Sequence, residues 1–480
     1  MLAGFDEEWF RARLDATPVG LSVASDERSA EGAALADLVV RLLARVYPRL
    51  ALVGPAAQIG PLAELATAIN PNIDLLTEAS LGIAVGDGAP FARTIHAGSD
   101  GWDGLIGDTE PQPVGSSENP LGAGVAACLA AAALFRAMFL PESTPMEGTT
   151  RFSALSADAA APNVRLAPWS LDGDAVLVGA GAVGQGALWA LSRAPLSGRV
   201  HVVDMEVIEL SNLQRYVLTQ RSDEGRSKVE IAATLSSSLE FVPHLEQLSS
   251  FLDQGGYRWD AMLLALDSAR DRVGAQASLP RFVANAWTQP GDLGVTSHSR
   301  FGGPGACVAC LYLPDGPRKN EDELVAETLG VPELLPQIRT LLATGQPIDR
   351  GLLEAVAHAV GQPVERMLPF EQRTLRELYV EGFCGGAAIP IGDAGRLQPA
   401  ALDVHVPLAH QSALAGVLLA SALVRLAASG DETVTHATRV DVLRSPGDLL
   451  RQPLRARRDG RCICDDPDFV SVYDTKYVRS

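Results

Sequence analysis

The sequence contains few cysteines, few aromatic residues and a modest share of charged ones. Among its 480 residues 6 are cysteine, 5% are aromatic and 20% are charged. Six cysteines in so long a chain exclude the dense disulfide framework of small secreted domains. The initial segment MLAGFDEEWF also lacks the basic start and the long apolar run of a signal peptide. These absences predict a soluble cytoplasmic protein.

An excess of positive charge is also missing, because the formal net charge is −19. So acidic a chain is not expected to bind duplex nucleic acid or an anionic membrane as its main partner. No stretch reads as a membrane span: the nearest, Leu121–Leu140, consists largely of weakly hydrophobic alanine and includes Arg136. The length and the 47% hydrophobic content predict a globular protein of two or three domains. We therefore predict no nucleic-acid partner and no membrane partner.

The densest group of motifs begins with an apolar run, predicted to be a strand, that enters a glycine-rich turn. A helix-compatible segment and a second apolar run follow, and the second run ends on an acidic residue. These features are Ala175–Val178, Gly179, Gly181, Gly184 and Asp204. Gly179 permits the tight turn, Gly181 lets the backbone approach a phosphate, and Gly184 lets helix and strand pack closely. A carboxylate at the end of the second strand suits ribose hydroxyls, so this pattern alone predicts only a nucleotide site.

Polar residues after Asp204 narrow the prediction. The motif SNLQR supplies Asn212 and Arg215, Lys228 follows, and Asp267 comes directly after another apolar run. An enzyme that splits ATP between its α and β phosphates needs such cations, because charge develops on the leaving pyrophosphate. A carboxylate at a strand end suits Mg²⁺ held against the phosphates. The combination resembles the ThiF-type adenylating family, whereas the glycine pattern alone would be weak evidence.

This family includes ubiquitin-activating enzymes and bacterial activators of sulfur-carrier proteins. The resemblance implies ATP and Mg²⁺ as cofactors, with Asp204 on the ribose and Asp267 on the metal. Asn212, Arg215 and Lys228 would stabilise the phosphates while the terminal carboxylate of a ubiquitin-like protein attacks the α-phosphate. A conjugating enzyme would then receive the activated protein. The resemblance thus implies the activating component of a ubiquitin-like conjugation system, and the alanine-, leucine-, arginine- and glycine-rich composition indicates that the system is bacterial.

An internal repeat is suggested by two similarities between the halves of the chain. Residues Leu50–Pro61 align with Ala175–Gly186, although Ala56 and Ile59 replace two of the glycines. The small-residue segment Asn119–Phe139 resembles Val406–Leu426, and both begin with Pro-Leu. The alternative is that any two α/β domains share such pieces. The repeat predicts an α/β fold of two tandem Rossmann-like adenylation domains, the first degenerate and the second active, paired as an internal pseudo-dimer, with further homodimerisation left open.

Spacing differs between the two similarities, which predicts an insertion in the second half. The glycine turns lie 125 residues apart and the Pro-Leu helices 287 apart, and the long, helix-rich stretch before the second Pro-Leu segment is the obvious insert. The predicted division is 1–148 for the inactive domain, 149–310 for the nucleotide-binding part, 311–400 for a helical insert with a crossover loop, and 401–480 for the remainder with a zinc-binding tail.

Four of the cysteines form two close pairs that lie far apart in the sequence. Cys307 and Cys310 form a CxxC motif, and Cys462 and Cys464 form a CxC motif. Two such pairs suit a tetrahedral Zn²⁺ site that ties the tail back to the domain. Adenylating relatives commonly carry CxxC twice, so the CxC motif departs from their pattern. A redox role for CxxC is the rival interpretation, but that motif would normally begin a helix rather than follow a glycine-rich segment.

The remaining cysteines receive opposite interpretations. Cys128 lies in an alanine-rich helix, where cysteine acts as a small hydrophobe. Cys384 lies in a glycine-flanked loop, YVEGFCGGAAIPIG. In the family a reactive cysteine occupies the chain that crosses the active site in this region, so the resemblance implies that Cys384 attacks the acyl-adenylate and forms a thioester. A buried or incidental cysteine is the alternative.

The resemblance also implies an arginine contributed to the phosphates by the partner half of the pseudo-dimer. Arg11 and Arg13 stand before the first predicted strand and are the candidates, although two ordinary surface arginines are an equal alternative. Arg272, in DSARDR, is interpreted as part of a solvated helix face. His405 and His410 are interpreted as structural residues.

The function predicted from these motifs is ATP-dependent activation of a ubiquitin-like protein, followed by thioester formation. Two rivals remain open. One is an adenylating enzyme for a sulfur carrier or a peptide that forms no thioester, and the other is a silent scaffold that binds a ubiquitin-like protein. The intact set of Arg215, Lys228 and Asp267 argues against a scaffold. A nicotinamide-dependent oxidoreductase is disfavoured because it has no need of SNLQR.

Overall fold

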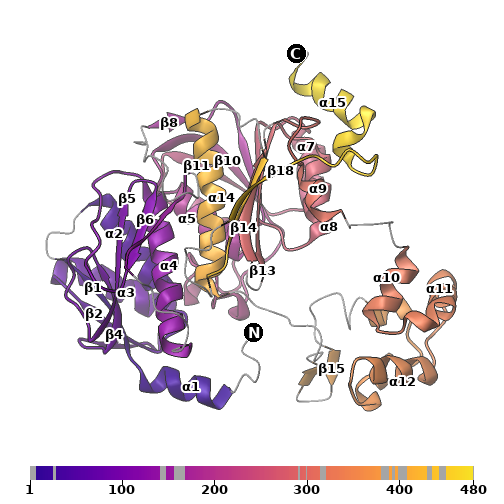
Figure 1. Cartoon of the computed structure of the whole chain (residues 1–480), viewed down its shortest axis with the longest axis horizontal. Helices are drawn as coiled ribbons and strands as arrows, with labels where there is room; N and C mark the ends of the chain where they lie inside the picture. Colours follow the sequence, from indigo (N-terminus) through magenta and orange to yellow (C-terminus); the bar gives the residue numbers. More distant parts are fainter. Residues whose placement is uncertain are drawn as a thin grey trace. The chain divides into compact units, whose positions relative to one another are not determined.

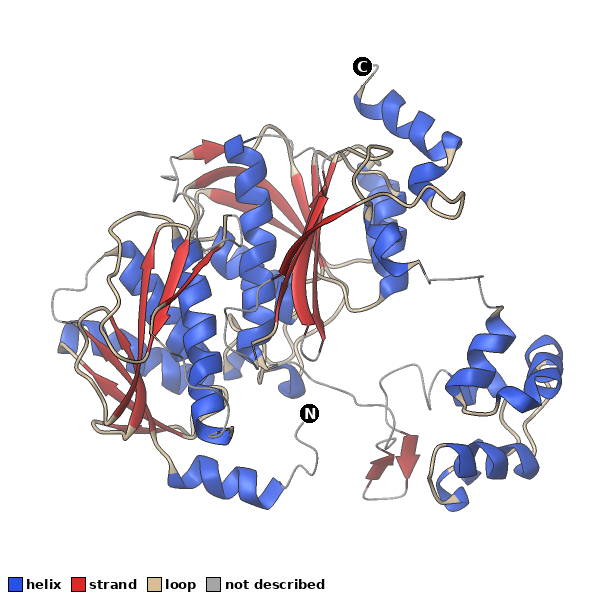
Figure 2. Ribbon diagram, in the orientation of Figure 1, coloured by secondary structure: helices blue, strands red, loops and turns tan. Residues whose placement is uncertain are grey.

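The computed structural model of the chain describes residues 7–24, 29–140, 148–155, 168–289, 292–298, 300–313, 320–379, 389–391, 395–397, 408–429, 435–442 and 450–478. The chain forms two compact units. One comprises Met1–Leu313 with Pro407–Ser480, and the other comprises Pro314–Val406. The first unit contains two large β-sheets with helices packed against them, coloured by secondary structure in Figure 2.

The first domain of the larger unit contains a sheet of seven strands in the order β3-β2-β1-β4-β5-β6-β7. Its strands are β1 (Val19–Val23), β2 (Arg49–Val53), β3 (Asp74–Leu76), β4 (Leu81–Val85), β5 (Arg93–Asp100), β6 (Asp103–Gly107) and β7 (Thr150–Ser153). Neighbours from β3 to β5 run parallel, whereas β6 and β7 pair antiparallel. The helices are α1 (Glu7–Ala16), α2 (Ala30–Leu43), α3 (Ala56–Ile69) and α4 (Pro120–Phe139).

The second domain contains a sheet in the order β11-β10-β9-β12-β13-β14-β17-β18, with β8 paired beside β10. Its strands are β8 (Trp169–Ser170), β9 (Ala175–Val178), β10 (Leu196–Val203), β11 (Leu239–His244), β12 (Ala261–Leu264), β13 (Phe282–Gln289), β14 (Asp292–His298), β17 (Thr435–Val440) and β18 (Leu450–Leu454). The helices are α5 (Ala182–Leu191), α6 (Lys228–Ala233), α7 (Leu248–Gly255), α8 (Ala269–Ala277), α9 (Val308–Tyr312), α14 (Ala409–Ser429) and α15 (Pro467–Tyr477).

The two sheets share one topology. In each, two parallel strands are added on one side of the first strand, the fourth and fifth strands continue parallel on its other side, and antiparallel strands follow. Strands β1 to β6 thus correspond in order to β9 to β14, and β7 corresponds to β17. Helix α4 precedes β7 as α14 precedes β17, so the matched Pro-Leu helices occupy equivalent places.

The other half of the sequence alignment was wrong by one strand. The segment Leu50–Pro61 forms β2 and the start of α3, and β2 corresponds to β10. The true counterpart of the glycine-turn strand β9 is β1, with the sequence VGLSV. A Val-Gly pair at a strand end suggested the wrong match, because short apolar strands before a turn look alike without their neighbours in the sheet.

Helices fill the space between the two sheets, as Figure 1 shows. Helix α4 packs on β4 to β6 and on α2, and also on α14, which in turn packs on α5 and on β12 to β14. A side chain on Gly416 would lie 2.3 Å from the backbone oxygen of Val183, so α5 and α14 approach at backbone contact. Two helices, Pro120–Phe139 and Ala409–Ala428, are long and apolar enough to cross a membrane, but 89% and 72% of their apolar windows are buried in this core.

The smaller unit, Pro314–Val406, covers most of the interval expected as an insert and contains its own apolar core. Its helices are α10 (Glu321–Thr328), α11 (Leu335–Thr344), α12 (Arg350–Ala359) and the short α13 (Leu375–Glu377), with a strand pair β15 (Ile389–Ile391) and β16 (Gly395–Leu397). Leu329, Ile338, Leu353 and Leu375 are fully buried there. Within α12 the buried residues Leu352, Leu353, Val356 and Ala357 recur at helical spacing, a pattern that the sequence alone displays.

Candidate functional site

The glycine-rich turn joins β9 to α5 and has no room for side chains at two of its three glycines. Gly179 has a positive φ of +93°, and a Cβ atom there would lie 2.6 Å from the carbonyl oxygen of Ala265. A Cβ on Gly184 would lie 2.0 Å from the carbonyl oxygen of Gly179. A Cβ on Gly181, in contrast, would meet only the ring of Tyr216, at 3.5 Å from its hydroxyl. These contacts fit the turn and close-packing roles predicted for Gly179 and Gly184, whose part in nucleotide binding stays a prediction.

Asp204 lies at the end of β10 and is bonded directly to this turn. Its Oδ2 accepts a hydrogen bond from the amide of Ala180 at 2.8 Å, and its Oδ1 accepts one from the amide of Glu206 at 2.8 Å. Each carboxylate oxygen retains a further lone pair. The side chain is half-buried. This geometry fixes an acceptor beside the glycine turn, where it suits a ribose hydroxyl.

The SNLQR motif begins within a short 3₁₀ helix, η1 (Leu210–Asn212), which is closed by a capping box. Asn212 Oδ1 accepts a hydrogen bond from the amide of Glu209 at 3.0 Å, while the Glu209 carboxylate accepts from the amide of Asn212. The Asn212 side-chain oxygen is thus occupied in holding the loop, and its NH₂ group remains the donor for a ligand. Arg215 lies three residues on, with its guanidinium carbon 5.6 Å from the ring centroid of Tyr216.

Lys228 begins α6 and is almost fully buried. Its ammonium group forms an ion pair with Glu206 and lies 5.3 Å from the ring centroid of Tyr216. Burial acts to lower the pKa of Lys228, but hydrogen bonds to Glu206 and Tyr216 outweigh it, so the pKa is raised. Lys228 is therefore a cation held in place beside the glycine turn.

Tyr216 connects these groups and was missed by the sequence analysis. Its side chain is buried, its hydroxyl lies beside Gly181, and both Arg215 and Lys228 lie over its ring. Aromatic faces attract such cations. A tyrosine directly after the motif arginine was the available signal, but one aromatic residue carries no spacing pattern to interpret.

Asp267 follows β12 and is exposed at the same edge of the sheet as the glycine turn. The amide of Ala265 donates to the carbonyl of Val178 at 2.9 Å, which links the start of the Asp267 loop to the end of β9. Carboxylate oxygens are the ligands that Mg²⁺ prefers. The exposed Asp267 side chain therefore fits the predicted metal role, which stays a prediction.

The interpretation of Arg272 as a solvated residue was wrong, because its side chain is 6% exposed. Its guanidinium donates to Asn285 Oδ1 at 2.7 Å, to the Ala286 carbonyl at 2.5 Å and to the Tyr312 hydroxyl at 3.2 Å, and also to the Leu266 carbonyl. Burial lowers the pKa of Arg272. Arg272 thus positions Leu266, the residue before Asp267. The charged sequence DSARDR gave no indication that one of its arginines is buried.

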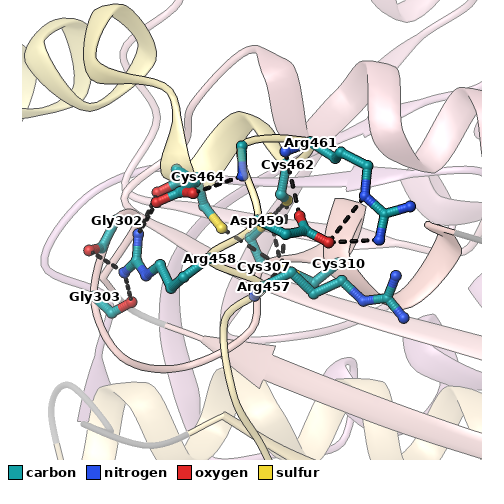
Figure 3. Close-up of polar contacts among 12 residues, drawn as sticks. Gly302, Gly303, Cys307, Cys310, Arg457, Arg458, Asp459, Arg461, Cys462 and Cys464 are labelled. Carbon is teal, nitrogen blue, oxygen red and sulfur yellow. Dashed lines mark hydrogen bonds and ion pairs between the residues drawn. The ribbon is translucent and has the colours of Figure 1, made fainter. Parts of the chain in front are cut away.

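A second candidate site lies where the CxxC and CxC motifs meet, shown in Figure 3. Cys307 caps α9, and the CxC pair brackets the start of the 3₁₀ helix η9 (Ile463–Asp465). The four buried sulfurs lie within 4.8 Å of one another, for example at 3.5 Å between Cys307 and Cys462 and 3.5 Å between Cys310 and Cys464. Tetrahedral Zn–S bonds of about 2.3 Å separate sulfurs by roughly 3.8 Å.

The sulfur cluster therefore fits the predicted zinc site, including the CxC departure. Hydrogen bonds from the other thiols, led by Cys307, lower the pKa of Cys310, and the amide of Arg457 donates to its sulfur at 3.4 Å. Arg458 fastens the same tail by donating to the carbonyls of Gly302 and Gly303 at 2.8 and 2.6 Å. Such a thiolate-stabilising setting is what a metal-ligating cysteine requires.

The remaining predicted residues lie away from these two sites or outside the described residues. Arg11 and Arg13 are exposed on α1, and Arg13 donates to the carbonyl of Met138 at the end of α4, at 3.3 Å. Their role at the phosphates stays a prediction. Cys128 is fully buried in α4, as expected. Cys384 and His405 lie outside the described residues, whereas His410 is buried at the start of α14.

The equivalent edge of the first sheet is built differently. After β4 the turn packs directly on the end of β1: Ser22 Oγ donates to the carbonyl of Ala89 at 2.7 Å, and a Cβ atom on Gly88 would lie 2.8 Å from the Ser22 carbonyl oxygen. The second domain holds the glycine turn and Asp267 at this place. The sequence that joins β1 to α2, residues 24–29, contains no glycine.

Two protein families match the chain, one in each half. The ThiF family matches residues 171–444, and Prokaryotic E2 family C matches residues 24–140. The second match does not show the first domain to be a degenerate adenylation domain, as the repeat suggested, although the two sheets share their topology.

Individual relatives differ in how much of the chain they cover. Uncharacterized protein y4jF of Sinorhizobium fredii is 41% identical over 98% of this chain and 93% of its own length. The Nedd8-activating enzyme E1 catalytic subunit of Drosophila melanogaster is 34% identical over 19% of this chain and 21% of that enzyme. Adenylyltransferase and sulfurtransferase MOCS3 of Arabidopsis thaliana is 26% identical over 44% and 45%. The chain thus spans less than half the length of these two enzymes.

Proposed function

The chain belongs to the ThiF family, and from this membership we propose that it activates the terminal carboxylate of a ubiquitin-like protein by ATP-dependent adenylation. The observation that carries the proposal is the cluster around the glycine turn. Asp204 bonds to the turn, Tyr216 lies against it, and Lys228 and Arg215 lie over the tyrosine ring. The Asp204 carboxylate can accept hydrogen bonds from sugar hydroxyls. The cations Arg215 and Lys228, together with the first amides of α5, can bind phosphate groups, so the cluster suits a nucleoside triphosphate.

In the proposed reaction a carboxylate oxygen of the ubiquitin-like protein attacks the α-phosphorus of ATP. The bond between the α-phosphorus and the bridging oxygen breaks, and pyrophosphate leaves with its electron pair. Arg215 and Lys228 stabilise the charge that develops on the leaving group, with the Asn212 NH₂ group as a further donor. Asp204 binds the ribose, and Asp267 would hold Mg²⁺, which neutralises phosphate charge when bound. The product is an acyl-adenylate.

The second proposed step uses Cys384. Its thiolate attacks the acyl carbon of the adenylate, AMP leaves, and a thioester joins the ubiquitin-like protein to the chain. Thiolate is a strong nucleophile and a good leaving group, which suits transfer to a conjugating enzyme. Among the other five cysteines, four form the sulfur cluster, where we propose that Zn²⁺ is structural, and Cys128 is buried. This leaves Cys384 as the candidate nucleophile.

We further propose that the first domain carries no acyl group itself. Cys128 is the single cysteine between residues 24 and 140, the segment matched by Prokaryotic E2 family C. It is fully buried in α4, and burial raises the pKa of its thiol. The shared sheet topology supports the first domain as a copy of the adenylation fold without nucleotide chemistry. A separate conjugating enzyme would then accept the thioester.

A second candidate function is adenylation of a sulfur carrier or a peptide without an enzyme thioester. The similarity to the adenylyltransferase and sulfurtransferase MOCS3 favours it, because that match is longer than the match to the Nedd8-activating subunit. Both functions share the adenylation step, and they differ only in the role of Cys384. Cys384→Ala separates them.

The test is ATP–pyrophosphate exchange with purified ubiquitin-like proteins, followed by a non-reducing gel of the wild type, Cys384→Ala and the control Cys128→Ala. Exchange that depends on the added protein, with a reducible adduct lost in Cys384→Ala and kept in Cys128→Ala, supports both steps. Exchange without an adduct in the wild type supports the second candidate. Absence of exchange with every ubiquitin-like protein encoded in the same genome contradicts the proposed adenylation.

A further inference from the structure

A buried segment directly after the SNLQR motif is held by residues from outside its own loop. The segment Tyr216–Thr219, called here the anchored segment, is 0–7% exposed at each position. Arg41 donates to the carbonyl of Val217 at 3.2 Å, and Arg45 donates to the carbonyl of Thr219 at 2.7 Å. Between them the amide of Leu218 donates to Gln185 Oε1 in α5 at 3.0 Å. Three successive residues of the segment are therefore fixed.

The anchored segment leads into the nucleotide site through short hydrogen-bonded steps. Both the amide and the hydroxyl of Thr219 donate to the carbonyl of Tyr216, at 3.1 and 2.8 Å. The amide of Tyr216 donates in turn to the carbonyl of Asn212 at 3.2 Å. The position of Thr219 thus determines where the Tyr216 ring stands, and that ring lies against Gly181 and beneath Lys228.

The two arginines belong to the first domain: Arg41 lies in the last turn of α2, and Arg45 lies in the turn directly after the helix. With Asp37 they form a stripe at a spacing of four residues, of which Asp37 and Arg41 lie on one face of the helix. Asp37 accepts from Arg41 at 2.9 Å, from Arg193 at 3.0 Å and from the Trp189 indole at 2.8 Å. The last two donors lie in or just after α5, so the stripe faces the second domain throughout.

Cationic donors make strong hydrogen bonds, and a buried carbonyl that loses its donor is costly. Arg45 is suited to this role because it donates to the anchored segment, whereas Arg41 also pairs with Asp37. Arg193 offers a contrast, since it bonds to Asp37 in the same interface and to the Trp189 carbonyl rather than to the segment.

We propose that the first domain supports ATP binding in the second through Arg41 and Arg45, which fix the anchored segment and so place Tyr216 and Arg215 beside the glycine turn. Both arginines are positioning residues that act through the segment. This inference rests on the proposed function, and it gives the first domain a role at the ATP site that differs from contribution of Arg11 or Arg13.

The experiment measures Mg-ATP affinity of the full chain by calorimetry, together with amide hydrogen exchange of residues 216–219, in Arg45→Met, Arg45→Lys and the matched control Arg193→Met. We expect Arg45→Met to weaken Mg-ATP binding about five- to tenfold and to speed exchange of the segment. Arg45→Lys, which keeps a cationic donor, should recover most of the affinity. Arg193→Met, which loosens the same interface, should lower the unfolding temperature but leave the Mg-ATP affinity within twofold of wild type.

Two results overturn the inference while the proposed function survives. One is wild-type affinity in Arg45→Met, and the other is equal loss of affinity in Arg45→Met and Arg193→Met, which would assign the effect to the interface as a whole. If Arg45→Met does not fold, Arg41→Met and Arg45→Lys are compared with Arg193→Met by the same criteria. Failure of the wild-type chain to bind Mg-ATP overturns the proposed function, and the inference with it.

Discussion

Replacement of Arg272 tests whether a buried cation supports the edge of the sheet that carries Asp267. In the structure its guanidinium donates to three carbonyl or amide oxygens and to the Tyr312 hydroxyl. Arg272 itself is only 6% exposed. Arg272→Met preserves the length and the apolar stem but leaves these acceptors without their donor. Each unsatisfied buried acceptor costs about 1–3 kcal/mol, although such costs are not additive.

We therefore expect Arg272→Met to lose about 3 kcal/mol of unfolding free energy, as for other buried charged contacts that lose one partner. At roughly 2–4 °C per kcal/mol for a large domain, the unfolding midpoint should fall by roughly 6–12 °C. The Leu266 carbonyl would no longer be held beside Asp267, so the Mg²⁺ concentration for half-maximal ATP–pyrophosphate exchange should rise about fivefold.

The matched control for this prediction is Arg270→Met, an exposed arginine on the same helix. Differential scanning fluorimetry and a Mg²⁺ titration compare both variants with the wild type. Arg270→Met should change neither quantity appreciably, because surface substitutions usually stay within about 0.5 kcal/mol. An unfolding midpoint of Arg272→Met within 2 °C of the Arg270→Met value would refute the reasoning from burial.

Three further expectations follow from the same structure. Gly184→Ala, whose Cβ would lie 2.0 Å from a carbonyl oxygen of the turn, should abolish calorimetric Mg-ATP binding, whereas Gly274→Ala, with open space around it, should leave binding intact; equal binding by both would contradict the close-packing role. Cys462→Ser should lose the one zinc per chain that elemental analysis is expected to find, and Cys128→Ser should retain it, so zinc retained in Cys462→Ser would exclude the sulfur cluster as the metal site. Burial lowers the pKa of His410 to about 3. As the pH falls below 6.5, this histidine therefore takes up a proton in the unfolded chain but not yet in the folded one. Stability should drop by about 2 kcal/mol between pH 6.5 and pH 5 through this group, and urea titrations of His410→Leu should lack that drop.

Local sequence patterns predicted the fold of the second domain and the residues of its candidate sites. The glycine turn, Asp204 and the SNLQR motif are local in the chain, and each has a physical requirement that one short segment expresses. A positive φ needs glycine, and a strand end presents a carboxylate. The pairs CxxC and CxC likewise predicted a metal site, because ligand type and spacing are read directly from the residues.

The residues that support those sites were recognised from tertiary contacts, not from sequence patterns. Arg272 stands in a charged run that reads as solvated, yet packing buries it. Arg41 and Arg45 are separated from the segment they contact by 176 and 174 residues. The counterpart of β9 was likewise recognised from the order of strands in the sheet, because the sequences of β1 and β2 do not indicate which position each strand takes. Burial and long-range contact depend on where distant segments meet, which local spacing does not encode.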